Sequence, residues 1–205
     1  MNNLVVAFLT VALITVSAHS RPANRQLTQS KCNLTEANSP NIRGIRLGMS
    51  TQQLLALFPG SADRKEIRDA LESAKAPASN ETARLYFEPA TYASRDRFAQ
   101  VDSVSVNVYK GRVSDFTVVY IGATWRNIDE WIGKLSEAFA LPGAQGWVSG
   151  PSENPNKILK CDGLEIEAGI GGGSASIRIS NARNAKEIED RINAEMEKKR
   201  REFKP

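Results

Sequence analysis

The chain has 205 residues, of which 41% are apolar and 24% charged, and its formal net charge is +4. These proportions are those of an ordinary globular protein, and about 185 residues without a leader are enough for one well-buried core or two small lobes. The basic excess is mild, so it gives no reason to expect nucleic acid as a partner.

Residues 1–20 have the pattern of a cleavable signal peptide. The apolar run from Leu4 to Val16 has the length of a signal-peptide core and is too short to span a bilayer comfortably. Small residues follow it, so we expect cleavage near Ala18 or Ser20. The leader lacks Lys and Arg, and the alternatives are an uncleaved N-terminal anchor or a buried helix. We therefore predict an exported protein, periplasmic or extracellular.

Two cysteines, Cys32 and Cys161, would both belong to the mature protein. In an oxidising compartment such a pair most economically forms one disulfide, which would tie the polar tail at 21–41 to the second half of the chain. The alternative is two unpaired buried thiols. Cys32 lies too far beyond the apolar run for a lipidated cysteine, and the residues before it lack the small neighbour that lipidation needs. We therefore exclude a lipid anchor.

The first half predicts two helices followed by a small sheet. Ser50 and Gln53 form a capping box for a short helix that ends at Pro59-Gly60. A second helix is expected over 62–74 and a short strand over 84–87.

Residues 101–120 have the alternating pattern of a β-hairpin. Apolar side chains stand at even numbers in both strands, which requires even positions to pair with even ones. A three-residue loop at 109–111 meets that requirement. It places Val104 opposite Phe116 and Ser105 opposite Asp115.

The second half repeats the order of helix and then meander. Asn127 and Glu130 begin an amphipathic helix that stops at Leu141-Pro142-Gly143. A strand at Trp147 leads to a three-stranded meander, in which Asp162-Gly163 is the strongest hairpin signal of the chain. That turn sets three cross-strand pairs: Cys161–Leu164, Leu159–Ile166 and Lys160–Glu165.

The last segment, 182–205, predicts an amphipathic helix with a basic end. Asn184 and Glu187 have capping-box spacing, and an apolar stripe runs through Ala185, Ile188, Ile192 and Met196. We interpret Lys198–Arg201 as a solvated helix end, because cations favour a helix C-terminus. The alternatives are contact with an anionic lipid membrane, a polysaccharide or nucleic acid.

These elements predict an α+β protein in which antiparallel meander sheets are packed by helices. We expect one domain at 42–181, with halves at 42–122 and 123–181, after the signal peptide at 1–20 and the tail at 21–41. The repeated order of helix and sheet is consistent with a degenerate two-fold repeat.

The segment Ile45-Arg46-Leu47-Gly48-Met49-Ser50-Thr51-Gln52-Gln53-Leu54 resembles a signature of bacterial envelope proteins. Those proteins have a beta-lactamase-inhibitor-like or small outer-membrane-assembly-lipoprotein-like fold. The resemblance covers residues 45–54 and implies a helix-loop-helix, an antiparallel sheet, and binding to other proteins rather than catalysis. The chain departs from the lipoprotein members because it lacks their lipidated cysteine.

Histidine usage restricts the chemistry, because the only histidine is His19 in or beside the predicted leader. Ser-His-Asp and Cys-His mechanisms therefore lack a general base, and zinc or copper lacks a histidine ligand. The glycine-rich segment 169–174 lacks the Lys-Ser/Thr of a phosphate loop and predicts a hairpin turn. We expect no catalytic residues, no metal site and no cofactor.

Our leading hypothesis is a non-catalytic protein-binding module of the cell envelope that presents one sheet face. The expected partner is another envelope or secreted protein. The face consists of polar residues that alternation points outward: Asn107, Asp115, Lys160, Glu165, Glu167 and Arg178. The alternatives are an exported hydrolase that uses carboxylates alone and a structural envelope protein held by its basic C-terminal helix. Trp125 and Trp147 are open candidates for stacking on a carbohydrate.

Overall fold

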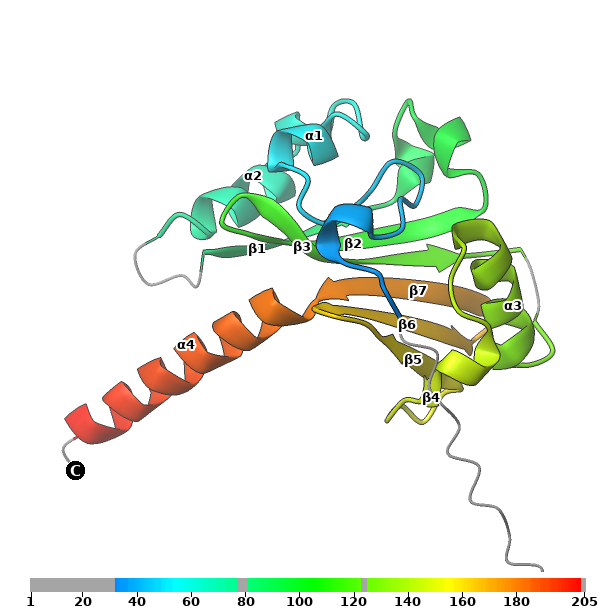
Figure 1. The fold of residues 1–205 in the computed structure, drawn as a ribbon. Coiled ribbons are helices and arrows are strands. Elements are labelled where there is room, and N and C mark those ends of the chain that lie inside the picture. Colours follow the sequence, from blue (N-terminus) through cyan, green and yellow to red (C-terminus); the bar gives the residue numbers. More distant parts are fainter. Residues whose placement is uncertain (1–31, 77–80, 123–124, 204–205) are drawn as a thin grey trace, which may run out of the picture.

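The computed structural model describes residues 32–76, 81–122 and 125–203. The predicted signal peptide, its cleavage site and most of the polar tail lie outside the described residues. Within them, seven strands form one antiparallel sheet in the order β1-β2-β3-β7-β6-β5-β4 (Figure 1). The strands are β1 (Thr82–Phe87), β2 (Val101–Tyr109), β3 (Arg112–Tyr120), β4 (Val148–Ser149), β5 (Asn156–Lys160), β6 (Leu164–Gly171) and β7 (Ser174–Asn181). The α-helices are α1 (Thr51–Leu55), α2 (Lys65–Ser73), α3 (Ile128–Phe139) and α4 (Ala182–Glu202).

The fold class is α+β, as predicted, but the two meanders form one sheet rather than two. They join where β3 pairs with β7, from Asp115 opposite Ser180 to Tyr120 opposite Ala175. This pairing satisfies two strand edges that separate sheets would leave unpaired.

The β2–β3 hairpin has a shorter loop and a different register from the prediction. Tyr109 pairs with Arg112 across a two-residue turn, Lys110-Gly111, whose φ angles of 50° and 73° are both left-handed. That turn pairs odd with even positions, and an extra residue at Ser114 then restores the pairing of even with even. The observed pairs are Val104–Val118, Ser105–Thr117, Val106–Phe116 and Asn107–Asp115, so the predicted pairs Val104–Phe116 and Ser105–Asp115 are wrong.

The hairpin at Asp162-Gly163 is confirmed. Gly163 adopts the left-handed conformation that the turn requires, with φ 76°. Leu159 lies opposite Ile166 and Lys160 opposite Glu165, and the Cys161 amide donates to the Leu164 carbonyl.

Capping residues predicted three helix starts, and two of them are confirmed. Ser50 and Gln53 form the reciprocal capping box of α1, and the Asn127 side chain accepts the Glu130 amide at the start of α3. The predicted start of the last helix is wrong. Asn181, at the end of β7, caps α4 because its side-chain oxygen accepts hydrogen bonds from two backbone amides of the first turn.

One side of the sheet carries the core. The N-terminal segment from Cys32, α1, α2 and α3 pack on it (Figure 1), and a single cluster of buried side chains runs from the first half to the second. Beneath α1 and α2, the Phe58 ring stacks on the rings of Phe87 and Phe98, with centroid distances of 4.1 and 4.8 Å. Among the described helices, none has an apolar stretch of the length needed to cross a membrane.

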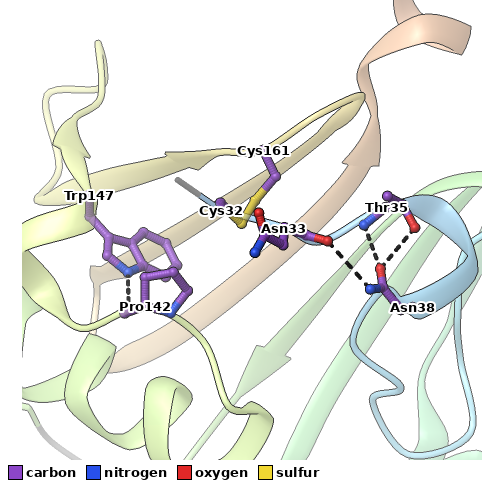
Figure 2. Close-up of a disulfide and its surroundings, with 7 residues drawn as sticks. All are labelled: Cys32, Asn33, Thr35, Asn38, Pro142, Trp147 and Cys161. Atoms are coloured by element: carbon purple, nitrogen blue, oxygen red, sulfur yellow. Dashed lines mark hydrogen bonds between the residues drawn. A yellow bond between two sulfur atoms is a disulfide. The ribbon is translucent and has the colours of Figure 1, made fainter. Parts of the chain in front are cut away.

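Cys32 and Cys161 form the predicted disulfide, which joins the N-terminal segment to the end of β5 (Figure 2). Beside it, the Trp147 indole donates to the Pro142 carbonyl at 2.9 Å. Trp147 is 5% exposed, so its ring is not accessible for stacking on a carbohydrate. The bond closes a stretch of 129 residues and anchors the N-terminal segment over the core.

Candidate functional site: the open face of the sheet

The side of the sheet away from α1, α2 and α3 is polar, and we refer to it as the open face. Strand side chains alternate between the two sides, and the pairing aligns outward residues of neighbouring strands into two rows across the sheet. The first row is Arg84, Asn107, Asp115, Ser180, Glu165 and Lys160. The second row is Tyr86, Ser105, Thr117, Arg178, Glu167 and Ile158.

All six residues that we expected to form a binding face lie in these two rows. Asn107, Asp115, Glu165 and Lys160 share the first row, and Arg178 and Glu167 are neighbours in the second. They come from β2, β3, β5, β6 and β7, which the β3–β7 pairing places in one sheet. The strand pairing therefore brings all six side chains to one side of the sheet.

Asp115 is the centre of a polar cluster on three strands. The Asn107 amide donates to both of its carboxylate oxygens, at 3.0 and 2.9 Å. Nε of Arg178 lies 3.6 Å from Oδ1 of Asp115, whose side chain is 18% exposed. The two-residue turn and the bulge at Ser114 together make this cluster, because they place Asp115 opposite Asn107 rather than in the predicted position opposite Ser105.

A second polar contact involves a residue that the sequence did not point to. The Asn156 amide donates to Oε1 of Glu167 at 2.7 Å, although Asn156 is only 9% exposed. Glu167 also lies opposite Arg178 across the β6–β7 pair. Asn156 therefore orients a carboxylate that belongs to the predicted face. An asparagine within a Pro/Asn/Ser loop is a common turn residue, so its type alone gave no such signal.

Lys160 and Glu165 are opposite each other, as predicted, on the part of the face nearest the disulfide. Lys160 is exposed and Glu165 half-buried. The charges of this corner are therefore open to solvent and to a partner.

The exposed apolar side chains at the two edges of the open face were also not predicted from the sequence. Tyr86 on β1 is 53% exposed, and Val148 on β4, the neighbour of Ile158, is 43% exposed. The available signal was the alternation of Tyr86 with the buried Leu85 and Phe87. Exposed aromatic residues are enriched at protein interfaces.

The start of α4 is held on the β2–β3 hairpin by charged contacts. Glu187 accepts hydrogen bonds from the Tyr109 hydroxyl at 2.7 Å and from Nζ of Lys110 at 2.9 Å. The bonds from Lys110 and then Tyr109 lower the pKa of Glu187, and the same Glu187 contact is the main cause that raises the pKa of Lys110 to about 12. Arg191 donates to a carboxylate oxygen of Glu81 at 3.0 Å.

The rest of α4 extends from the body (Figure 1), and Ile192 and Met196 are 39% and 48% exposed. The basic end pairs within the helix. Lys199 lies 3.0 Å from Glu195, Arg200 lies 3.4 Å from Glu197, and Lys198 lies 3.9 Å from Glu202. These pairs are typical of a solvated helix surface.

Comparison with known proteins places the chain in no family: no protein-family model matches it, and neither the curated proteins nor the solved structures contain a match.

Proposed function

We propose that this protein is an exported, non-catalytic module that binds another protein through the open face of its sheet. The observation that carries the proposal is the convergence of six residues, from five strands, on one side of a sheet whose other side carries the core. A rigid sheet presents these side chains in a fixed pattern, which keeps the entropy cost of binding low.

Export is supported by the disulfide between Cys32 and Cys161. Such bonds persist in oxidising compartments and are rare in the cytosol. The signal peptide at 1–20 is the part of this proposal that rests on the sequence alone.

The absence of catalysis is supported by the lack of any histidine after His19.

The partner surface that fits the open face carries both charge signs. In the first row Asp115 and Glu165 lie between Arg84 and Lys160 at its two ends, and in the second row Glu167 lies opposite Arg178. Tyr86 and Val148 add exposed apolar area at the edges. We expect a partner with complementary charges in its centre, since such patterns set orientation and specificity.

The experiment is affinity capture of the exported protein, residues 21–205, from its native envelope and culture medium, with mass spectrometry of the retained proteins. A variant with Lys160→Thr, Glu165→Thr and Glu167→Gln removes three charges of the open face, and the glutamine side chain keeps an acceptor for Asn156. A control variant carries Lys65→Thr, Glu66→Thr and Glu72→Gln on α2, on the opposite side of the sheet, where all three residues are exposed.

We expect one stoichiometric partner that the wild-type and control proteins retain and the open-face variant loses, with all three proteins equally folded by circular dichroism. Retention of that partner by the open-face variant would contradict this choice of face. Capture of no protein at all would contradict the binding-module proposal itself.

A further inference from the structure

A second candidate site lies on the covered side of the sheet, beside α3. It is a cavity of about 620 Å³, within the range of about 300–1,000 Å³ that is typical of small-molecule sites. Its lining comes from separate stretches of the chain: Arg43, Gln100 before β2, Tyr120 at the end of β3, and the segment from Trp125 to Phe139. The open face takes no part in it, so this inference does not depend on the proposed function.

Aromatic rings form the apolar wall of the cavity. Trp131 is 7% exposed, and its indole donates to the Ser176 carbonyl at 2.9 Å, which fixes the ring. The rings of Trp125 and Tyr120 lie against it, with centroids at 5.0 and 5.4 Å. Both of these rings are half-buried, so part of each remains available to a ligand. The wall suits an apolar body.

Two donors on this wall have no partner in the described part of the structure. The indoles of Trp131 and Trp147 donate to backbone carbonyls at 2.9 Å each, whereas the Trp125 indole makes no such bond there. The Tyr120 hydroxyl also lacks a protein partner among these residues. Burial raises the pKa of Tyr120 and the Arg43 charge opposes that rise, so the hydroxyl keeps its proton at neutral pH and can donate. Free donors in an apolar cavity favour a ligand that accepts.

Of the two cations that line the cavity, one has no carboxylate partner within residues 32–76, 81–122 and 125–203. Lys134 pairs with Glu137 at 3.2 Å, and both line the cavity. Arg43 donates to the Ala99 carbonyl at 3.3 Å, which holds it beside the cavity with most of its donors unused. A guanidinium in this state binds a carboxylate well, because two parallel N–H groups match the two oxygens.

Arg43 and Gln100 also have left-handed backbones, with φ 55° and 67°. Non-glycine residues seldom adopt this conformation, and such positions gather at ligand sites. Here both line the same cavity.

We propose that this cavity binds a small apolar carboxylic acid, with the carboxylate on Arg43 and the alkyl or aryl body against Trp125, Tyr120 and Trp131. The Trp125 indole and the Tyr120 hydroxyl are further donors to the same acid.

The test titrates residues 21–205 with decanoate, with 2-naphthoate and with the neutral decan-1-ol. Calorimetry and tryptophan emission measure the binding. Arg43→Gln removes the proposed carboxylate partner. Arg46→Gln is the matched control, because Arg46 is also exposed and lies outside the cavity lining. Trp125→Leu reduces the aromatic wall, and thermal unfolding checks that each variant is folded.

We expect at least one acid to bind with Kd below about 1 mM, and the tighter acid identifies the body as alkyl or aryl. Arg43→Gln should raise the Kd of that acid at least about tenfold and leave the Kd of decan-1-ol unchanged. The loss of affinity should be larger for Arg43→Gln than for Arg46→Gln. Trp125→Leu should weaken the binding of every acid that binds the wild-type protein. The proposal is overturned if neither acid saturates, if decan-1-ol binds as tightly as decanoate, or if the two arginine variants lose affinity equally.

Discussion

The two faces of the sheet are built from the same strands and have opposite environments. Phe116, Ile177 and Ile166 are 0% exposed under the helices. Their immediate neighbours Thr117 and Arg178 lie on the open face, half-buried and exposed respectively. Because side chains alternate with a period of two, one step along a strand separates a residue needed for stability from one available for binding. Substitutions at adjacent positions therefore separate the two properties.

The largest expected effect is on the covered face. Phe116→Ala should lower the free energy of unfolding by about 3–5 kcal/mol, since it opens a cavity beneath the helices. Thr117→Ala, one residue away on the open face, should cost less than about 1 kcal/mol. Urea unfolding of the two variants measures both values. Similar losses for the two would show that the faces do not differ as described.

The disulfide is the next largest contribution. Replacing Cys32 and Cys161 by serine should lower the free energy of unfolding by about 2–4 kcal/mol, because the bond restricts a loop of 129 residues in the unfolded chain. Wild-type protein in reductant should match the double variant under the same denaturant titration. Equal stability of the oxidised and reduced wild-type proteins would contradict this expectation.

A smaller effect is expected within the open face. Asp115→Ala leaves the Asn107 amide and Arg178 without their shared acceptor, so it should cost about 1 kcal/mol. Asp96→Ala is a suitable control, because the Asp96 side chain is 99% exposed and reaches only its neighbour Arg95, at 3.9 Å. Chemical denaturation should separate the two variants. If Asp115→Ala were as neutral as the control, the polar cluster would have no part in ordering the face.

The smallest effect concerns the attachment of α4. The pKa of Glu187 in the folded state lies below its ordinary value of 4.5, so the contribution of its contacts is complete above that pH and is lost as the pH falls through the folded pKa. Lys110, with its pKa raised to about 12, stays charged over that range. We expect the backbone amides of α4 to become more mobile in NMR relaxation on acidification, and Glu187→Gln to reproduce this at neutral pH. Unchanged relaxation in both cases would contradict the role of Glu187.

Local patterns predicted the elements well, because capping and alternation depend on near neighbours. Ser50, Asn127 and Asp162-Gly163 each specify their turn or helix start through contacts within a few residues. The predicted register of the hairpin at Lys110-Gly111 was wrong, because the extra residue, Ser114, is of a type that does not mark a bulge. A bulge changes the register without changing the alternation that the prediction relied on.

Long-range features were beyond such patterns. The outward direction of Asp115 and Arg178 followed from alternation, but their contact depends on the pairing of β3 with β7. The cavity beside α3 depends on chain segments as far apart as Arg43 and Phe139. Trp125 was noted in the sequence as an open candidate for ligand stacking, and its neighbours in the cavity were not.

The central claim is that a protein partner covers the open face. It is tested most directly by hydroxyl-radical footprinting of residues 21–205, alone and in complex with the partner recovered by capture. Tyr86 on the open face is 53% exposed and Met196 on α4 is 48% exposed, so both should be labelled in the free protein. We predict that the partner protects Tyr86 and leaves Met196 labelled; protection of Met196 with Tyr86 still labelled would place the partner on α4 and contradict the account.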